Sequence, residues 1–449
     1  YDIAGYKFNL NSNKELSKVL RNLPNFKVLN DENGKPLLTK TGDLKLDKDT
    51  LLKYSEESEL PFMKKIAEYN HYIKEISQLG ATSKIKEKNN TLFKHDEEVE
   101  ATGFLASVYK GRLHGGYKLH GTETGRISGG GGLNSTINWQ NMPKTKEFRK
   151  LFLPSRNAVF GTSDYDAMEV CIASQIAGSG VLEQLILEEK DMHCYTAVQL
   201  MEMLGKKTTY EEVYAKTKIE GQEDEEFLKY RADSKGVNFS GLYGSTKYGM
   251  AGSFGVSIED GEKFLNAFYQ SYPEIKIYMD TYREHAKTYG YVKTLLGRKK
   301  RLPQLTYIGK DSFTNYHASY SINNLLNAAI NAPIQGTSGQ VTLIAMTNIW
   351  REFNKRDLKS KVLINVHDEI VTEIYIDELE IVESIIKECM ETPYYKNHGG
   401  CKVKLTAGLV YGELWKYGKS KEYWNTHLDE WEECLQNIEN RNTNNIMTI

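Results

Sequence analysis

Four residues in the segment RADSKGVNFSGLYG recur at one spacing: Arg231, Lys235, Phe239 and Tyr243. On an α-helix, residues four apart follow one another along a slowly turning stripe. Two cations followed by two aromatic rings suit neither a buried face nor a solvent face. They suit a ligand that is anionic at one end and flat at the other, which predicts a nucleoside triphosphate with its phosphates on the cations. A coincidental surface stripe is the alternative.

Three glycines interrupt the same segment: Gly236, Gly241 and Gly244. Each lowers helix stability by roughly 1 kcal/mol relative to alanine. They therefore predict either the close approach of a flat group or a bend in the helix.

Acidic residues stand at two predicted strand ends. Asp164 ends the strand-like segment AVFGTSDY and precedes a predicted helix start at EVCIASQIA. Such positions carry chemistry in α/β proteins, although a helix cap is the alternative because aspartate is a good N-cap residue. The triplet His367-Asp368-Glu369 falls where a tight hairpin would turn between the strand-like segments 361–366 and 370–376. A solvent-facing acidic turn is the alternative there.

The composition is that of a globular protein without a strong charge bias. The chain has 449 residues, 40% hydrophobic and 26% charged, and a formal net charge of −2. This length predicts two or three subdomains, and the charge balance confines any nucleic-acid site to a local patch. No apolar segment approaches the ~20 residues of a membrane span. Five scattered cysteines without C-x-x-C spacing argue against a zinc site or a disulfide framework and predict a reducing compartment.

The predicted elements change in character along the chain. A glycine-punctuated loop is expected over 31–47, and the glycines at 129–132 predict a flexible tether. From about residue 160, short apolar strands alternate with helices. Helical patterns cover 12–23, 59–77, 229–244, 323–350 and the start of 428–445.

The order of these motifs closely resembles family A DNA polymerases, the bacterial polymerase-I-like enzymes. The resemblance runs from about Phe8 to about Trp415, with SYPEIKIYM, GYVKTLLGRKKRLP and NAPIQGTSGQ as supporting matches. The matching motifs are Thr124-Gly-Arg-Ile-Ser128, Asn138-Trp-Gln-Asn-Met-Pro143, Asp164-Tyr165 with Glu169, Asp191-Met-His193, the Arg231 stripe and His367-Asp-Glu369.

The resemblance implies an α+β fold shaped like a right hand, with a helical thumb and helical fingers around an antiparallel-sheet palm. The implied divisions are an N-terminal remnant over 1–7, a thumb over 8–100, a first palm segment over 101–174, fingers over 175–326, and over 327–449 the second palm segment with a C-terminal tail.

The resemblance also implies two Mg²⁺ ions, for which Mn²⁺ could substitute. Asp164 and Asp368 match the family's metal-binding aspartates, and Tyr165 would add its backbone carbonyl. Two such ions can stabilise the primer 3′-oxygen and the pyrophosphate leaving group during phosphoryl transfer. Asp164, Asp368 and Lys235 are therefore the expected catalytic residues.

Several residues match family positions that contact the incoming dNTP. Arg231, Lys235 and His193 correspond to triphosphate contacts. For His193, a structural histidine with satisfied hydrogen bonds is the alternative. Phe239 matches the position that senses the sugar 3′ side, where phenylalanine implies discrimination against dideoxynucleotides. Two further expectations concern the template and the sugar: Tyr243 fills the templating-base slot before nucleotide entry, and Glu169 is a steric gate that excludes a 2′-hydroxyl.

Primer-template DNA is the implied partner. Minor-groove acceptors are nearly the same for every correct base pair, so contacts there check shape without reading sequence. The lysines between residues 64 and 86 would hold duplex phosphates. The matching residues are Arg126, Asn138, Gln140 and Asn141 at the minor groove, Asn331, Gln335 and His367 as further contacts, and Glu369 near the primer terminus.

The sequence departs from the family pattern in four places. Asp166-Ala-Met-Glu-Val-Cys171 stands where Ser-Gln-Ile-Glu-Leu-Arg is common, and Asn327 stands where many members have arginine. The run from Ser128 through Ile137 replaces a Ser-Ser-x-x-Pro link, and 205–227 reads as a charged insertion at the surface of the fingers. These departures affect primer contacts and fidelity but leave the metal ligands and the stripe intact.

Three other functions use similar residues. A single-subunit RNA polymerase shares the two aspartates, but Glu169 and Glu369 count against it. A catalytically silent DNA-binding scaffold would not need acids that repel phosphates. A magnesium-dependent nuclease also pairs acids, but we find no room for a proofreading domain before Phe8 and expect no 3′–5′ exonuclease activity.

The remaining expectations concern context. We expect a monomer in a bacterial or phage-infected cytoplasm, with no membrane partner; an organelle stays open as the location. The sequence leaves open whether a processivity factor or an upstream exonuclease or helicase domain works with this chain.

Overall fold

The computed structural model describes most of the chain. The described residues are 8–10, 12–23, 26–30, 36–39, 41–57, 62–80, 104, 107–119, 121–130, 137–219, 221–307, 316–392, 404–440 and 447–448. Two compact units result, Tyr1–Ser107 and Val108–Ile449. The predicted remnant over 1–7 and thumb boundary at residue 100 lie outside the described residues.

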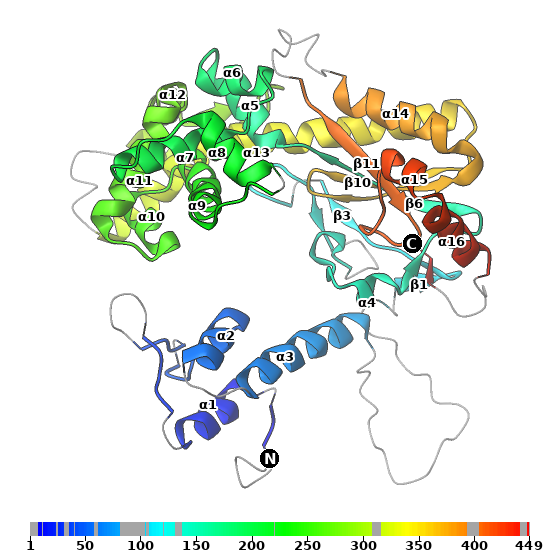
Figure 1. The fold of residues 1–449 in the computed structure, drawn as a ribbon, viewed down its shortest axis with the longest axis horizontal. Coiled ribbons are helices and arrows are strands. Elements are labelled where there is room, and N and C mark those ends of the chain that lie inside the picture. The colour runs from blue at the N-terminus through cyan, green and yellow to red at the C-terminus, as the bar shows by residue number, and fades with distance from the viewer. Residues whose placement is uncertain are drawn as a thin grey trace. The chain divides into compact units, whose positions relative to one another are not determined.

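The first unit is a small helical domain with its own core (Figure 1). It contains α1 (Asn13–Arg21), α2 (Lys48–Glu57) and α3 (Phe62–Leu79). The predicted helices correspond to α1 and α3, and the Ser12 hydroxyl caps α1 by accepting from the Glu15 amide at 3.3 Å. Sequence analysis did not predict α2. Fully buried side chains that fill this core include Leu20, Leu44, Leu51, Tyr54 and Met63.

A four-stranded antiparallel sheet organises the second unit. Its strand order is β11-β6-β10-β9, so the central strands β6 and β10 have neighbours on both sides. The predicted strand AVFGTSDY is confirmed as β6. The strands are β6 (Ala158–Tyr165), β9 (Lys361–Val366), β10 (Glu369–Tyr375) and β11 (Ala407–Gly412).

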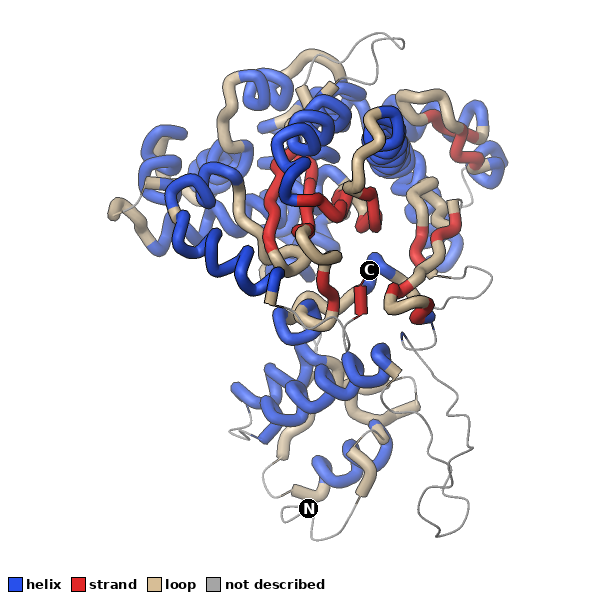
Figure 2. The backbone as a smooth tube through the Cα atoms, turned by 90° about the vertical axis from the view of Figure 1, so that its right-hand side faces the viewer, coloured by secondary structure: helices blue, strands red, loops and turns tan. Residues whose placement is uncertain are grey.

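Long helices cover this sheet. The 40-residue helix α13 (Tyr316–Lys355) contacts α5 (Met168–Ala177), α14 (Leu379–Glu391) and β9. Figure 1 shows α13 (yellow) running from the α7–α12 helices to α14 beside the sheet. Figure 2 shows these helices around the red strands. The shared core includes Val159, Ile370, Ile374 and Tyr411 of the sheet and Ile172, Ile334, Val341 and Ile385 of the helices.

A group of helices lies between α5 and α13 in sequence and forms a separate cluster in Figure 1. The polar helix α8 is anchored by one fully buried residue, Val213, in a small core with Phe227. The predicted charged surface insertion is therefore partly packed. The helices are α6 (Val181–Leu187), α7 (Met192–Met203), α8 (Tyr210–Lys218), α9 (Glu225–Leu242), α10 (Lys247–Phe254), α11 (Ile258–Ser271) and α12 (Pro273–Tyr289).

Smaller elements complete the second unit. They are β1 (Val108–Tyr109), β2 (Arg112–Leu113), β3 (Tyr117–Lys118), β4 (Ser128–Gly129), the 3₁₀ turn η2 (Trp139–Asn141), α4 (Lys146–Arg149), β5 (Phe152–Leu153), β7 (Tyr291–Lys293), β8 (Lys299–Arg301), η3 (Pro303–Tyr307), η5 (Ile376–Glu378), α15 (Lys421–Thr426), α16 (Leu428–Glu439) and β12 (Met447–Thr448).

The structure differs from two predictions about local structure. The predicted hairpin turn contains only His367 and Asp368, because Glu369 is the first residue of β10 and pairs with Val366. The predicted glycine tether begins in strand β4, where Gly129 pairs with Tyr117, and 131–136 lie outside the described residues. The α+β class with an antiparallel sheet is confirmed. Among the helices of the described residues, none is both long and apolar enough to span a membrane.

Candidate active site

Three acidic residues meet at the open end of the β6–β10 pair. Asp164 and Glu369 are direct cross-strand partners, and Asp368 immediately precedes Glu369. Asp164 is exposed although the rest of β6 is buried. The alternative role of Asp164 as a helix cap is wrong, because Ala167 occupies the N-cap position of α5. The structure thus brings the two predicted metal-binding aspartates together from segments about two hundred residues apart.

Left-handed backbone conformations surround these acids. His367 has a φ of 58°, Ala167 of 45° and Lys416 of 70°. None of these residues is glycine, for which this region is unstrained. Such outliers persist only where the surrounding structure enforces them, and they concentrate at functional sites.

Glu369 is buried rather than part of a solvent-facing turn. Its side chain accepts a hydrogen bond from Trp415 Nε1 at 3.1 Å and pairs with Lys416 Nζ at 2.5 Å. The Arg149 guanidinium stacks 3.6 Å from the centre of the Trp415 ring. Burial of a carboxylate requires such partners, so Glu369 fixes the start of β10 beside Asp368.

Arg126 bridges two of the predicted site residues. Its Nη2 pairs with Glu169 Oε1 and lies 3.3 Å from Asp368 Oδ1. Burial raises the pKa of Glu169, and Arg126 opposes this shift only in part. Arg126, predicted to contact the minor groove, therefore also holds the steric-gate candidate against the metal-ligand candidate.

The acidic cluster fits a divalent cation. Asp164, Asp368, Glu169 and Glu369 carry four negative charges against three positive charges on Arg126, Lys416 and Arg149. Loss of water contacts and the charge of Glu369 raise the pKa of Asp164, as expected where cations are too few. Across the described ranges, no three His, Cys, Asp or Glu side chains form a ready metal cage. Two carboxylates with waters and substrate phosphates match the preference of Mg²⁺.

This surplus of negative charge predicts a stability effect. Asp164→Asn is expected to raise the melting temperature of the metal-free protein by roughly 1–2 °C at pH 7, because it removes a like charge opposite Glu369. An ionised carboxylate with a raised pKa lowers stability above that pKa, and protonation removes the effect. The difference should therefore shrink as the pH falls towards about 4.

Thermal melts of both proteins across this pH range test the prediction. Asp166→Asn is the control, because Asp166 is exposed and accepts a hydrogen bond from Thr406 Oγ1 at 3.1 Å. No gain in melting temperature at pH 7 for Asp164→Asn would contradict the argument.

Three residues of the predicted stripe, Arg231, Lys235 and Phe239, lie on α9, and the fourth, Tyr243, is its C-cap. Lys235 and Phe239 are exposed, and Lys235 has no ion-pair partner in the described part of the chain. Arg231 Nη2 pairs with Asp191 Oδ2 at 2.5 Å. Sequence analysis did not predict this counterion. Arginine has five N–H donors, so the pair leaves others for a ligand.

His193 lies beside the stripe with a defined hydrogen-bond partner. Its Nδ1 is 3.0 Å from the Asn238 side-chain amide, whose oxygen accepts from Thr196 at 2.8 Å. The His193 and Phe239 rings are 6.2 Å apart. If the Asn238 nitrogen donates to Nδ1, the imidazole carries its proton on Nε2. Burial lowers the pKa of His193; Asp191 opposes this, whereas Arg231, Lys235 and Lys218 reinforce it.

The three glycines of this segment serve the protein's own packing. An added Cβ would lie 2.7 Å from the Phe254 ring at Gly236 and 2.5 Å from the Phe268 ring at Gly241. The predicted flat groups are therefore internal aromatic rings. Gly244 follows the end of α9 with a φ of 74°, which provides the predicted bend.

The end of α9 contacts α13. Asn331 donates from its amide to the Tyr243 backbone carbonyl at 3.4 Å. Asn327, which departs from the family pattern, accepts a hydrogen bond from Arg283 at 3.2 Å. Asn331, which is predicted to contact primer-template, thus also holds the Tyr243 turn in place.

The other predicted primer-template residues lie near these elements. Asn138 caps η2 and accepts from the Gln140 amide at 3.0 Å. Gln140 accepts from Gly129 N and donates to Ile127 O, both at 3.0 Å, so it clamps β4. Asn141 and His367 are exposed, and Gln335 is half-buried on α13. The described lysines of the predicted basic face, Lys64, Lys65 and Lys74, are exposed on α3.

Sequence analysis missed several residues around both clusters. Tyr117 bonds both backbone groups of Asn365, at 2.8 and 3.0 Å, beside the His367 turn. Trp415 and Lys416 hold Glu369, and Lys218 reaches Asp191. These contacts carry no local signal, because the partners are remote in sequence.

The two clusters share one wall. Val170, which follows Glu169 on α5, lines a small apolar cavity together with His193 and Phe239. The acidic end of the sheet and the Arg231 stripe therefore flank the same first turns of α5.

A model of DNA polymerase family A matches residues 1–417. DNA polymerase I of Lactococcus lactis subsp. lactis (strain IL1403) is 29% identical over 397 residues, covering 87% of this chain and 38% of that protein. DNA polymerase I of Caldicellulosiruptor bescii is 28% identical over 421 residues, covering 92% and 42%. The chain thus spans about two fifths of the length of these relatives.

A solved structure has the same fold. It is the POL domain of Pol1 from M. smegmatis, in complex with DNA primer-template and dNTP, at a TM-score of 0.69 and 24% identity. The match covers 93% of this chain and 63% of that one. Because the family model spans residues 1–417 of 449, the chain belongs to DNA polymerase family A.

Proposed function

We propose that this chain is a template-directed DNA polymerase domain that adds dNTPs to a primer 3′-hydroxyl and releases pyrophosphate. The observation that carries the proposal is the pairing of Asp164 and Glu369 across β6 and β10, which places Asp164 beside Asp368. Family membership and the adjacent stripe on α9 support it. The relatives named DNA polymerase I supply the activity by analogy.

The stripe provides the proposed nucleotide site. Arg231 and Lys235 would bind the phosphates, and the His193 imidazole would donate from Nε2 to a phosphate oxygen. Phe239 would lie against the sugar, while Glu169, held by Arg126, would fill the space below the 2′ position. Fixed cations and donors oriented towards developing negative charge are the main source of catalysis in phosphoryl transfer.

The acids provide the proposed metal site. Asp164 and Asp368 would hold Mg²⁺ with the Tyr165 carbonyl, and Mn²⁺ could substitute. When bound, the metal supplies charge stabilisation to the attacking 3′-oxygen and to the pyrophosphate. Glu369 stays buried against Trp415 and Lys416 and keeps the Asp368 turn in place. Tyr117 holds the other strand of the same hairpin through Asn365.

A basic hairpin supports primer-template DNA as the partner. Strands β7 and β8 line a cleft of about 230 Å³ together with Pro333 of α13. Phosphate contacts by such residues position a duplex without reading its sequence. The basic residues that line the cleft are Lys293, Arg298, Lys299, Lys300 and Arg301.

Primer extension on one primed template tests the proposal. The chain should extend the primer with dNTPs in Mg²⁺, fail with NTPs, and stop when EDTA is added. Efficient use of NTPs would assign an RNA polymerase. Tight duplex binding without extension would assign a scaffold, and degradation of the primer would assign a nuclease.

Phe239→Tyr tests the assignment of the sugar contact. Phe239 is 40% exposed and its ring lies beside His193. A tyrosine hydroxyl there could replace the hydrogen bond that a missing 3′-hydroxyl would have made. We expect dideoxynucleotide incorporation relative to dNTP to rise about 100-fold or more. Chain-termination ladders measure it, and unchanged ladders would contradict the role; Tyr248→Phe, an exposed position on α10, is the control.

A further inference from the structure

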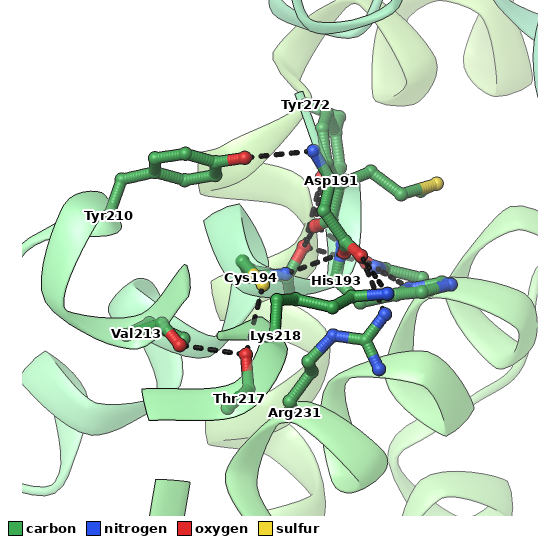
Figure 3. A network of polar contacts seen from close by, with 12 residues as sticks. Asp191, His193, Cys194, Tyr210, Val213, Thr217, Lys218, Arg231 and Tyr272 are labelled. Atoms are coloured by element: carbon green, nitrogen blue, oxygen red, sulfur yellow. Dashed lines mark hydrogen bonds and ion pairs between the residues drawn. The ribbon is translucent and has the colours of Figure 1, made fainter. Parts of the chain in front are cut away.

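Helix α8 places one lysine at the phosphate end of the stripe. Lys218, the last residue of α8, lies 3.4 Å from Asp191 Oδ2 through its Nζ. Arg231 reaches the same oxygen from α9. Figure 3 shows both side chains meeting at Asp191. Lys218 thus joins the cluster of Arg231, Lys235 and His193.

The attachment of α8 does not depend on Lys218. Val213 is fully buried against α7 and α9. The Tyr210 hydroxyl accepts from the Asp191 amide at 2.9 Å, and Thr217 Oγ1 lies 3.6 Å from Cys194 Sγ. The Lys218 side chain itself is 40% exposed. An exposed ion pair adds little to stability, so the position of this lysine needs another explanation.

The charge around Asp191 favours an anion. The Asp191 carboxylate accepts from the backbone amides of His193 and Cys194 at 2.8 and 3.0 Å, which saturates it at the N-terminus of α7. Although burial opposes it, the hydrogen bond from Arg231 lowers the pKa of Asp191 to about 2. One negative charge therefore faces both Arg231 and Lys218. Lys235 nearby on α9 has no ion pair among the described residues, so positive charge remains in excess.

We infer that Lys218 is a third cation of the nucleotide site, one that contacts the terminal phosphate of the incoming dNTP. The assignment rests on the proposed function. The stripe orients the ligand. Phe239 contacts the nucleoside, Lys235 lies one turn closer to the N-terminus of α9, and Arg231 lies one turn closer still. Lys218 shares a carboxylate with Arg231, so it belongs to the end furthest from the sugar. Asp191 holds it there before the nucleotide arrives.

Binding of dNTP and dNDP to complexes with a dideoxy-terminated primer tests this assignment. Loss of one charge-assisted contact should raise the dNTP dissociation constant of Lys218→Met about five- to tenfold. The dissociation constant of dNDP, which lacks the terminal phosphate, should change less than about twofold. Lys218→Arg should restore most of the dNTP affinity, because it keeps the charge.

Lys207→Met is the matched control. Lys207 is exposed near the start of α8 and has no ion pair among the residues that the structure describes, so both affinities should stay within twofold. Equal weakening of dNTP and dNDP in Lys218→Met, with a lower melting temperature, would assign a structural role and overturn the inference. So would unchanged dNTP binding.

The wild-type protein separates this inference from the proposed function. If it does not extend a primer and binds no dNTP, the proposed function fails. If it extends the primer normally and Lys218→Met keeps the wild-type preference for dNTP over dNDP, only the inference about Lys218 fails.

Discussion

Asp368→Ala is expected to reduce the rate of primer extension about 1000-fold or more while leaving duplex affinity within a few-fold of wild type. At the open end of the sheet, Asp164 is exposed and Asp368 is half-buried. The variant loses one of these two carboxylates, which are proposed to hold the metal. Duplex binding should persist because it depends on phosphate contacts elsewhere. Single-turnover extension and a gel-shift titration measure the two quantities.

Asp166→Ala is the control for this variant. Asp166 lies two residues from Asp164, is exposed, and bonds Thr406 instead of the cluster. Its extension rate should stay within about threefold of wild type, as for most surface substitutions. Extension retained by Asp368→Ala would overturn the metal assignment.

The second large effect concerns sugar selection. Glu169→Ala is expected to reduce the preference for dNTP over NTP about 100-fold, because it opens space where a 2′-hydroxyl would lie. Glu169 is only 13% exposed, and Arg126 holds it in place. Single-nucleotide insertion with dATP and ATP on one template gives the ratio of the two values of kcat/KM.

Glu169→Gln separates size from charge. Glutamine keeps the volume but weakens the pair with Arg126, so the preference for dNTP should stay close to wild type. If the glutamine and alanine variants lose the preference equally, charge rather than bulk excludes the hydroxyl. If neither loses it, Glu169 is not the gate.

Local patterns in the sequence were sufficient for part of this site. The period of 3.6 residues places Arg231, Lys235 and Phe239 on one face of α9, and the structure has that helix. The short apolar segments AVFGTSDY and KVLINV identified β6 and β9 as strands. Each of these signals lies within about a dozen residues, where propensity and spacing dominate.

Remote contacts escaped the sequence analysis. Glu369 was expected in a turn, but β10 is buried on both faces and therefore shows no alternation that would reveal an acid inside it. Its partner Trp415 lies 46 residues further on. Arg231 and Asp191 are 40 residues apart, so neither helix pattern indicates the pair.

Side chains predicted to contact DNA can also make hydrogen bonds within the protein. Asn138 and Gln140 were assigned to DNA from motif position, and the structure shows their amides in use within η2 and β4. The residue type alone does not distinguish an amide that stabilises a turn from one that faces a ligand. The same holds for α2, whose polar sequence hides the buried Leu51 and Tyr54.

The strand order of the central sheet also bears on how the protein is made. Asp164 has Glu369 on one side and Gly408 on the other. The ribosome synthesises both partners more than two hundred residues after Asp164. A nascent chain therefore carries β6 with two open edges and few local contacts to close them, which makes folding slow and exposes apolar surface. Until translation passes β11, the sheet around Asp164 therefore stays incomplete.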